Sequence, residues 1–395
     1  MTSTQFVFSV DMNWHSIVSF FRGKHQSTTA SASPWLLTIN GLFLSTITLA
    51  SYGLCRVLGI ICFGYNCNSD RVETKRLAVA YSVTMLLIAG TYTPIALQIL
   101  YADMVFLRQN DLLTYVGYIR YGVMLTCALA TLLMQVIYRH AIVASVNQML
   151  HLWSFLLDKP NIVNGYVTWK VVSKCSTALL QVLWIVFLIE KDNAMSNPWY
   201  LATLFFVHYC LLVLQMTLNM LYFGVLLITL QIQQLNAKLI GLLLQLRSLP
   251  HHRGGLGSRF RSHLLHRVGQ LMHTHFTLVK LSISYVRLYG LQLLGFLMSV
   301  LMECITQIFI MYFVPIEMWR QERKGKQVGA RQRPLPINPY AVLYVLGLLW
   351  DMFLVVVMLD NMRLQFLHTR HLYTSSIWLK ALTSSANLRL EGCVS

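Results

Sequence analysis

Long apolar runs separated by shorter polar segments dominate the pattern along this chain. Six runs contain roughly 20 or more mostly apolar residues, the length an α-helix needs to cross the hydrocarbon core of a bilayer. A helix satisfies its own backbone hydrogen bonds, so helices are the elements that these runs predict. The predicted spans are Leu77–Ala102, Leu112–Tyr138, Val171–Ile189, Trp199–Leu230, Ile283–Phe313 and Tyr340–Leu359.

Two further features extend this pattern. The stretch Asn193–Ala237 is uncharged and far longer than a bilayer needs, so the fourth helix is expected to continue beyond the membrane. Residues 35–55 are also uncharged but contain Asn40 and several Ser and Thr, which fits an extra span, an interfacial helix or a cytosolic helix. The predicted fold class is therefore all-α, a polytopic membrane helix bundle. Its parts are a cytosolic segment 1–76, a bundle 77–362 with a cytosolic loop 231–281, and a cytosolic tail 363–395.

Composition supports a membrane protein over a soluble one. Hydrophobic residues make up 56% of the 395 positions and charged residues only 11%, against about 25% charged residues in soluble domains. The formal net charge of +17 favours anionic membrane lipids as partners. No nucleic-acid-binding motif accompanies the basic residues, so no nucleic acid is expected to bind.

The distribution of Lys and Arg predicts the orientation, because cytoplasmic loops carry an excess of both. With residues 1–76 placed in the cytosol, 21 of the 31 basic residues, Lys174 among them, lie on the inner side. Eight lie outside, and Arg120 and Arg287 lie within spans. We therefore expect a cytosolic amino terminus. The segment Trp319–Pro334 is discordant, since it places six basic residues in a short outer loop.

Sequence motifs for catalysis and cofactor binding are missing. The chain has no Gly-rich phosphate loop, no nucleophile elbow and no paired carboxylates on one helical face, so neither an enzyme nor a cofactor is expected. His263 and His266, like His273 and His275, have the spacing of zinc ligands. No Cys or acidic residue lies in residues 231–281, so this segment is interpreted as a solvated basic loop and not a metal site.

Three ionisable residues, Arg120, Glu303 and Asp351, lie well inside predicted spans. A charge in hydrocarbon costs at least a few kcal/mol and normally faces a partner or a cavity. At about 1.5 Å per residue, Arg120 and Glu303 lie at similar depths in their helices. We expect these two residues to form an ion pair, which either holds two helices together or contacts a ligand directly.

Local motifs resemble those of a known receptor family. The run YGLCRVLGIICFGYNCNSDRVETKRLAVAYSV (52–83) resembles the segment that precedes the first span of fruit-fly gustatory receptors, with an LG-containing stretch, an FxY-like turn and a basic cluster. The stretches LLITLQIQQLNAKL (226–239) and LDNMRLQF (359–366) are also similar to that family. The resemblance covers roughly residues 52–391.

This resemblance implies a taste receptor in the plasma membrane of gustatory neurons. Members have seven spans and a cytosolic amino terminus, and they assemble as homo- or hetero-tetrameric ligand-gated cation channels. The ligand would be a small-molecule tastant held among the outer halves of the spans, where stacking and a few hydrogen bonds suit such molecules. The candidate ligand-binding residues are Tyr118, Arg120, Trp184, His208 and Gln307.

The end of the sequence departs from that family. No run of 20 apolar residues follows Leu359, where the resemblance implies a cytosolic approach to a seventh, pore-lining span. We therefore expect this chain to be a shortened form of such a receptor, without the pore helix.

Two other classes of membrane protein remain open alternatives. Counting residues 35–55 as a span gives the seven spans of a G-protein-coupled receptor, but no acidic residue precedes Arg139 at the end of the third span. Neither Asn197-Pro198 nor Asn338-Pro339 has the NPxxY spacing of such receptors. A secondary transporter is the second alternative, although no internal repeat or matched pair of broken helices favours it.

Overall fold

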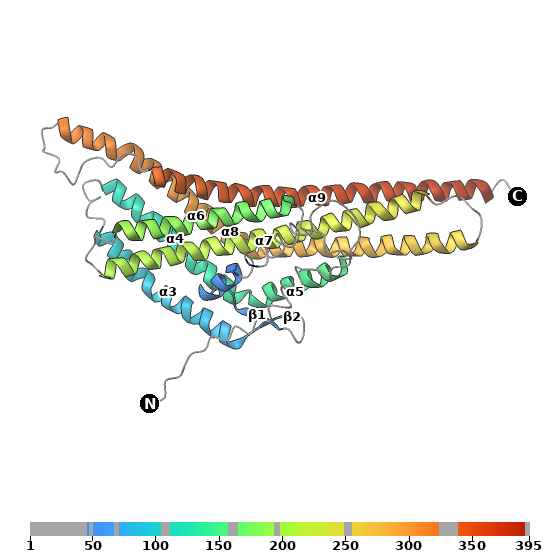
Figure 1. The fold of residues 1–395 in the computed structure, drawn as a ribbon, viewed down its shortest axis with the longest axis horizontal. Helices are drawn as coiled ribbons and strands as arrows, with labels where there is room; N and C mark the ends of the chain where they lie inside the picture. The colour runs from blue at the N-terminus through green and yellow to red at the C-terminus, as the bar shows by residue number, and fades with distance from the viewer. Residues whose placement is uncertain are drawn as a thin grey trace, which may run out of the picture. The chain divides into compact units, whose positions relative to one another are not determined.

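The fold is helical throughout most of the described chain, which in this computed structural model comprises residues 46, 50–66, 71–103, 111–156, 165–192, 198–248, 255–323 and 339–391. The prediction of an all-α polytopic bundle is confirmed. A two-stranded hairpin of β1 (Phe63–Asn66) and β2 (Arg71–Thr74) precedes the long helices (Figure 1). The helices are α3 (Arg76–Asp103), α4 (Asp111–Ile137), α5 (Arg139–Leu156), α6 (Gly165–Asp192), α7 (Pro198–Ser248), α8 (Gly255–Arg323) and α9 (Pro339–Glu391).

Five stretches of the described helices are long and apolar enough to cross a membrane. They are Arg76–Tyr101, Tyr115–Ile137, Pro198–Gln245, His266–Phe309 and Val342–Leu372. Helix α6 covers the predicted span Val171–Ile189 but is not among these five. The fourth predicted helix continues well past Leu230, because α7 ends only at Ser248.

Two segments that the sequence pattern assigned to loops are largely helical. Helix α5 lies in the stretch between the second and third predicted spans, and its buried residues Ile142, Met149 and Leu156 recur at intervals of seven residues. In residues 231–281, α7 runs to Ser248 and α8 begins at Gly255. Helix α5 is amphipathic, with buried apolar residues at helical spacing and polar side chains such as His140 and His151 on its exposed face.

The described chain divides into two compact units. The first unit contains the hairpin, α3, α4 and α6, together with the amino-terminal parts of α7 and α9 and the carboxyl-terminal part of α8. The second contains most of α5 and the remaining parts of α7, α8 and α9. Side-chain hydrogen bonds join the helices of the second unit. Among them, Gln231 donates to the Met149 carbonyl at 2.8 Å, Thr369 donates to Asn236 Oδ1 at 2.6 Å, and Tyr285 donates to the Met220 carbonyl at 2.9 Å.

A glycine ends the short helix that precedes the hairpin. Residues 50–57 are helical, and Gly59 follows with φ of 75°, a left-handed conformation that glycine adopts without strain. The amides of Gly59 and Ile60 donate to the carbonyls of Arg56 and Cys55, the two bonds of a Schellman motif. The LG pair of the quoted N-terminal run is therefore a helix stop that directs the chain into β1.

Tyrosine hydroxyls attach this amino-terminal segment to the first unit. A helix leaves its last carbonyls without intrahelical partners, and here Tyr81 of α3 donates to the Val57 carbonyl at 2.6 Å and Tyr209 of α7 to the Leu58 carbonyl at 3.0 Å. Apolar side chains of the segment itself, among them Ile60 and Ile61, are buried. The segment is thus a folded part of the first unit.

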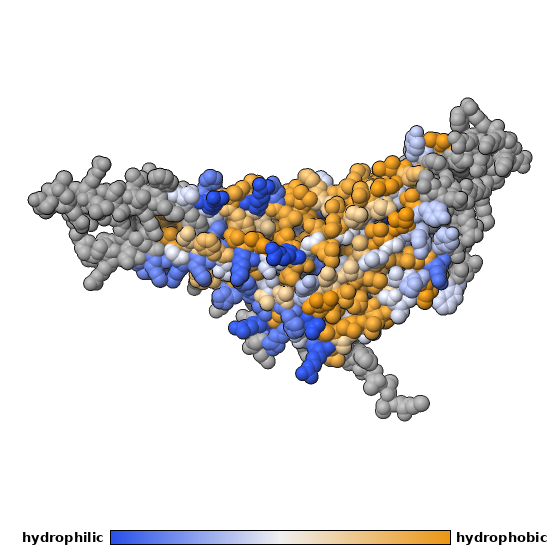
Figure 2. Space-filling model, turned by 180° about the vertical axis from the view of Figure 1, so that it is seen from behind, coloured by the Kyte–Doolittle hydropathy of each residue, from blue (hydrophilic) through white to orange (hydrophobic). Residues whose placement is uncertain are grey.

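Apolar side chains cover a broad area of the surface, with hydrophilic side chains gathered beside it (Figure 2). On α9 several large apolar residues are about half exposed, namely Leu343, Leu346, Leu349, Phe353 and Val356. Soluble monomers rarely expose contiguous apolar patches of this kind. These faces are those expected of helices that contact lipid.

A close helix contact in the second unit depends on Gly224. A Cβ atom added there would overlap the ring and hydroxyl of Tyr285, which is 4% exposed. We expect Gly224→Ala to destabilise the folded protein by about 1–3 kcal/mol through overpacking. Thermal melting of the detergent-solubilised full chain measures the loss. Gly241→Ala, also on α7 but with no atom within 4 Å of the added Cβ, is the matched control; equal melting of the two variants would contradict the prediction.

The buried thiol of Cys55 should react slowly. Its side chain is 2% exposed, and burial raises its pKa from 9.0 to about 12. A shift of this size lowers the thiolate fraction at neutral pH by about a thousandfold, and the thiolate is the reactive form. In maleimide labelling of intact protein, Cys55 should remain unlabelled while a cysteine introduced at Val57, which is 64% exposed, is modified. Comparable labelling rates at the two positions would show that the Cys55 thiol is accessible to the reagent and contradict the prediction.

Candidate functional site

Five polar side chains from four helices of the first unit form what we call the Glu303 cluster. Its members are Arg120 of α4, His208 of α7, Glu303 and Gln307 of α8, and Tyr344 of α9. All five lie in predicted spans, where polar groups are expected to face the interior of the bundle.

An ion pair forms the centre of the Glu303 cluster. Arg120 Nε lies 2.6 Å from Glu303 Oε2, and Gln307 Nε2 donates to Glu303 Oε1 at 2.9 Å. Both carboxylate oxygens therefore have a partner. Glu303 and Gln307 stand four residues apart on α8, so the helix itself brings their side chains together. The Arg120 guanidinium also lies over the Tyr121 ring, 4.7 Å from its centroid, which adds a cation–π contact.

His208 lies within electrostatic range of Arg120 and is 8% exposed. Neither of its ring nitrogens has a hydrogen-bond partner among the described residues. A neutral imidazole carries one donor and one acceptor, and leaving a buried polar group unsatisfied costs about 1–3 kcal/mol. A polar molecule bound beside the ring would remove this cost, so His208 is the member of the cluster best suited to contact a ligand.

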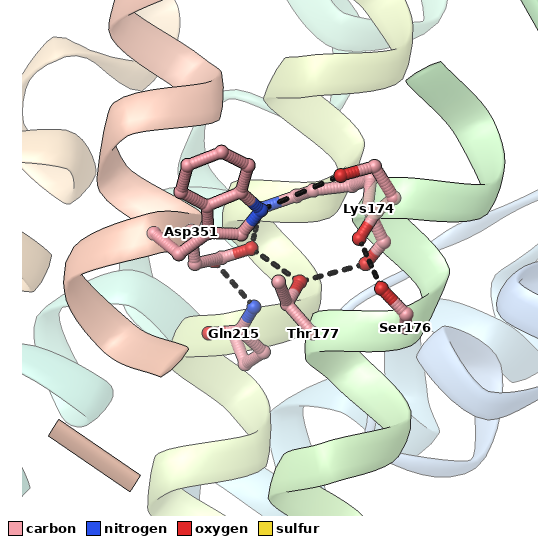
Figure 3. Close-up of polar contacts among 7 residues, drawn as sticks. Lys174, Ser176, Thr177, Gln215 and Asp351 are labelled. Carbon is pink, nitrogen blue, oxygen red and sulfur yellow. Dashed lines mark hydrogen bonds and ion pairs between the residues drawn. The ribbon is translucent and has the colours of Figure 1, made fainter. Parts of the chain in front are cut away.

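A second set of polar side chains, the Asp351 cluster, joins α6, α7 and α9 in the same unit (Figure 3). Lys174 Nζ lies 2.5 Å from Asp351 Oδ1, Thr177 Oγ1 lies 2.7 Å from the same oxygen, and Gln215 Nε2 donates to Asp351 Oδ2 at 2.6 Å. Lys174 and Asp351 are both 0% exposed. An ion pair so far from water is retained only when further hydrogen bonds satisfy its atoms, and Thr177 and Gln215 supply them here.

Sequence reasoning missed the partner of Asp351. Lys174 was counted among the basic residues at the inner side of the membrane, whereas the structure buries it within α6. A usable signal was present, because Lys174 lies inside an apolar run and an intramembrane cation requires a counter-charge. The three-residue spacing of Lys174 and Thr177, which places them on one helical face, was a second signal.

The remaining candidate residues do not join the Glu303 cluster by any described contact. Tyr118 packs edge-on against Tyr101, with ring centroids 5.7 Å apart, and is 38% exposed. The side chain of Trp184 lies outside the part of the structure that is described. Arg120, His208 and Gln307 are thus the three candidates that the fold brings together.

Buried ionic clusters, apolar outer faces and several helices of membrane-spanning length together define a multi-pass membrane protein with a polar interior. A model of the 7tm chemosensory receptor family matches residues 48–386, so the chain belongs to this family. The chain is also 25% identical over 328 residues to "Putative gustatory receptor 77a" of Drosophila melanogaster, an alignment that covers 77% of this chain and 71% of the relative. The family is one of receptors and not of enzymes.

The Arg120–Glu303 pair yields a direct test. Glu303→Gln removes the negative charge and leaves the Arg120 guanidinium without compensation, and breaking a buried pair in this way costs about 3–5 kcal/mol. We expect a severalfold lower surface level of the variant, measured by biotinylation. The charge-swapped Arg120→Glu/Glu303→Arg chain should recover part of the loss. Wild-type surface levels of Glu303→Gln would show that the pair does not stabilise the bundle.

Proposed function

We propose that this chain is a gustatory receptor subunit that detects small-molecule tastants through the Glu303 cluster. The family match and the fruit-fly relative support a chemosensory role. The observation that carries the choice of site is His208, a buried imidazole beside an ion pair, whose two nitrogens have no hydrogen-bond partner among the described residues.

The charges of the cluster indicate the kind of ligand. Arg120 and Glu303 compensate each other, and Gln307 completes the partners of the carboxylate. A charged ligand would meet no uncompensated opposite charge there and would lose its hydration on entering. A neutral organic molecule with one hydrogen-bond donor and one acceptor fits His208 better, and Tyr344 adds an aromatic surface.

We further propose that the protein acts as a subunit of a tetrameric ligand-gated cation channel, with itself or with other gustatory receptors, in the plasma membrane of taste neurons. The orientation that supports this assignment places 21 of the 31 Lys and Arg residues on the cytosolic side. Under that orientation the Glu303 cluster lies in the outer half of the membrane, the side from which a tastant arrives.

Substitution of His208 tests the site. The full chain is expressed with gustatory receptor subunits that conduct on their own, and Ca²⁺ entry is recorded during application of a fixed panel of sugars, amino acids and bitter alkaloids. For each compound whose response requires the chain, His208→Phe should raise the half-maximal concentration about tenfold, equivalent to the loss of about 1.4 kcal/mol of hydrogen bonding. His208→Asn, which keeps a donor and an acceptor, should lose less.

Thr217→Val is the matched control for this experiment. Thr217 is equally buried on α7 but donates only to its own helix, at Val213. It should reach the surface normally and leave the half-maximal concentration unchanged. If His208→Phe behaves like Thr217→Val for every active compound, the cluster is not the ligand site.

A further inference from the structure

Two helices, α7 and α9, each contribute one side chain to the Glu303 cluster and one to the Asp351 cluster. Helix α7 contributes His208 to one cluster and Gln215 to the other, and helix α9 contributes Tyr344 and Asp351 in the same way. Both pairs are seven residues apart, which is about two helical turns or 10.5 Å along the axis. The two clusters are therefore separated by the same distance, about two turns, along both helices.

The contacts of the Asp351 cluster form at only one position of α9 along α6 and α7. Asp351 receives hydrogen bonds on both carboxylate oxygens, from α6 through Lys174 and from α7 through Gln215. A displacement of α9 by one turn, about 5.4 Å, would separate a fully buried ammonium from a fully buried carboxylate. Apolar helix faces alone oppose such a displacement weakly, because one apolar contact replaces another.

We infer that the Asp351 cluster sets the position of α9 along α6 and α7 and thereby positions Tyr344 in the Glu303 cluster. Lys174, Asp351, Gln215 and Thr177 are on this account positioning residues that do not touch a ligand. A buried polar contact that fixes the register of neighbouring helices is the best-attested specific role of such contacts. The inference rests on the proposed function only in taking the Glu303 cluster as the site of recognition.

A cross-linking experiment without any ligand tests the position of α9. Tyr344 lies within electrostatic range of Cys304, a free cysteine of α8. In the full chain, a short bifunctional thiol reagent should join Tyr344→Cys to Cys304. A protease site introduced between residues 323 and 339 separates the two halves unless the cross-link holds them, so the uncleaved mass of surface-biotinylated protein reports the cross-linked fraction. Cross-links that do not involve Cys304 are subtracted with Cys304→Ala in the same background.

The informative variant removes both charges at once. Lys174→Met/Asp351→Leu leaves no unpaired buried charge, and such apolar replacements of a buried ion pair are often neutral for folding. We expect the cross-linked fraction of surface protein to fall about fivefold, equivalent to a loss of about 1 kcal/mol of register preference. Cross-linking of Leu348→Cys, one turn further along α9, should rise in the same background. Lys174→Arg keeps the pair and should retain most of the Tyr344→Cys cross-link.

Two outcomes would overturn the inference. One is an unchanged Cys304 cross-link in the Lys174→Met/Asp351→Leu chain, and the other is no Cys304-dependent cross-link in the parent. If the double variant does not reach the surface, Thr177→Val/Gln215→Leu removes two contacts of Asp351 and keeps the ion pair; a reduced cross-link supports the inference and an unchanged one overturns it.

Tyr92→Phe is the matched control. It removes a different polar contact of the first unit, that between Tyr92 of α3 and Thr203 of α7 at 3.3 Å, and should leave the cross-link intact. Failure of the His208 variants to alter any response would reject the proposed ligand site but leave the cross-linking result standing, so the two failures are distinguishable.

Discussion

A charge inside hydrocarbon must find its counter-charge within the protein, and the arrangement of helices in the first unit follows from this constraint. Asp351 and Lys174 are fully buried on different helices, and two further polar groups complete the shell of the carboxylate. Lipid offers neither charge a partner, so the bundle is stable only when α6, α7 and α9 meet at one register. Apolar side chains can make contacts at several positions of one helix along another, whereas the ion pair forms at only one.

The same constraint distinguishes the two clusters. In the Asp351 cluster the carboxylate has partners on both oxygens and solvent is excluded, which suits a fixed structural contact. In the Glu303 cluster the ion pair is equally close, but the neighbouring His208 ring has no described partner for either nitrogen. A carboxylate with partners on both oxygens stabilises one fixed arrangement. A ligand that bonded to His208 would instead recover the free energy that the ring nitrogens, unpartnered among the described residues, now cost.

Backbone groups obey a related rule at the amino-terminal segment. The helix at residues 50–57 ends in a Schellman motif at Gly59, and the hydroxyls of Tyr81 and Tyr209 donate to carbonyls that the helix end leaves free. These contacts attach the hairpin to α3 and α7. The local motif that resembled gustatory receptors thus has a physical basis in helix termination and in attachment to the first unit.

The sequence alone determined the all-α class, the approximate limits of the long apolar helices and the continuation of α7, because hydrocarbon imposes length and composition on each helix independently. It also indicated that Arg120 and Glu303 lie at similar depths. It did not identify α5, whose apolar residues recur at helical spacing among polar ones, or the amino-terminal part of α8 within residues 231–281, which is rich in Arg and His. Only the tertiary structure decided that Lys174 faces Asp351 and that His208 lies near Arg120. Those contacts depend on how helices distant in sequence rotate and slide against one another, and composition along a single helix does not encode that choice.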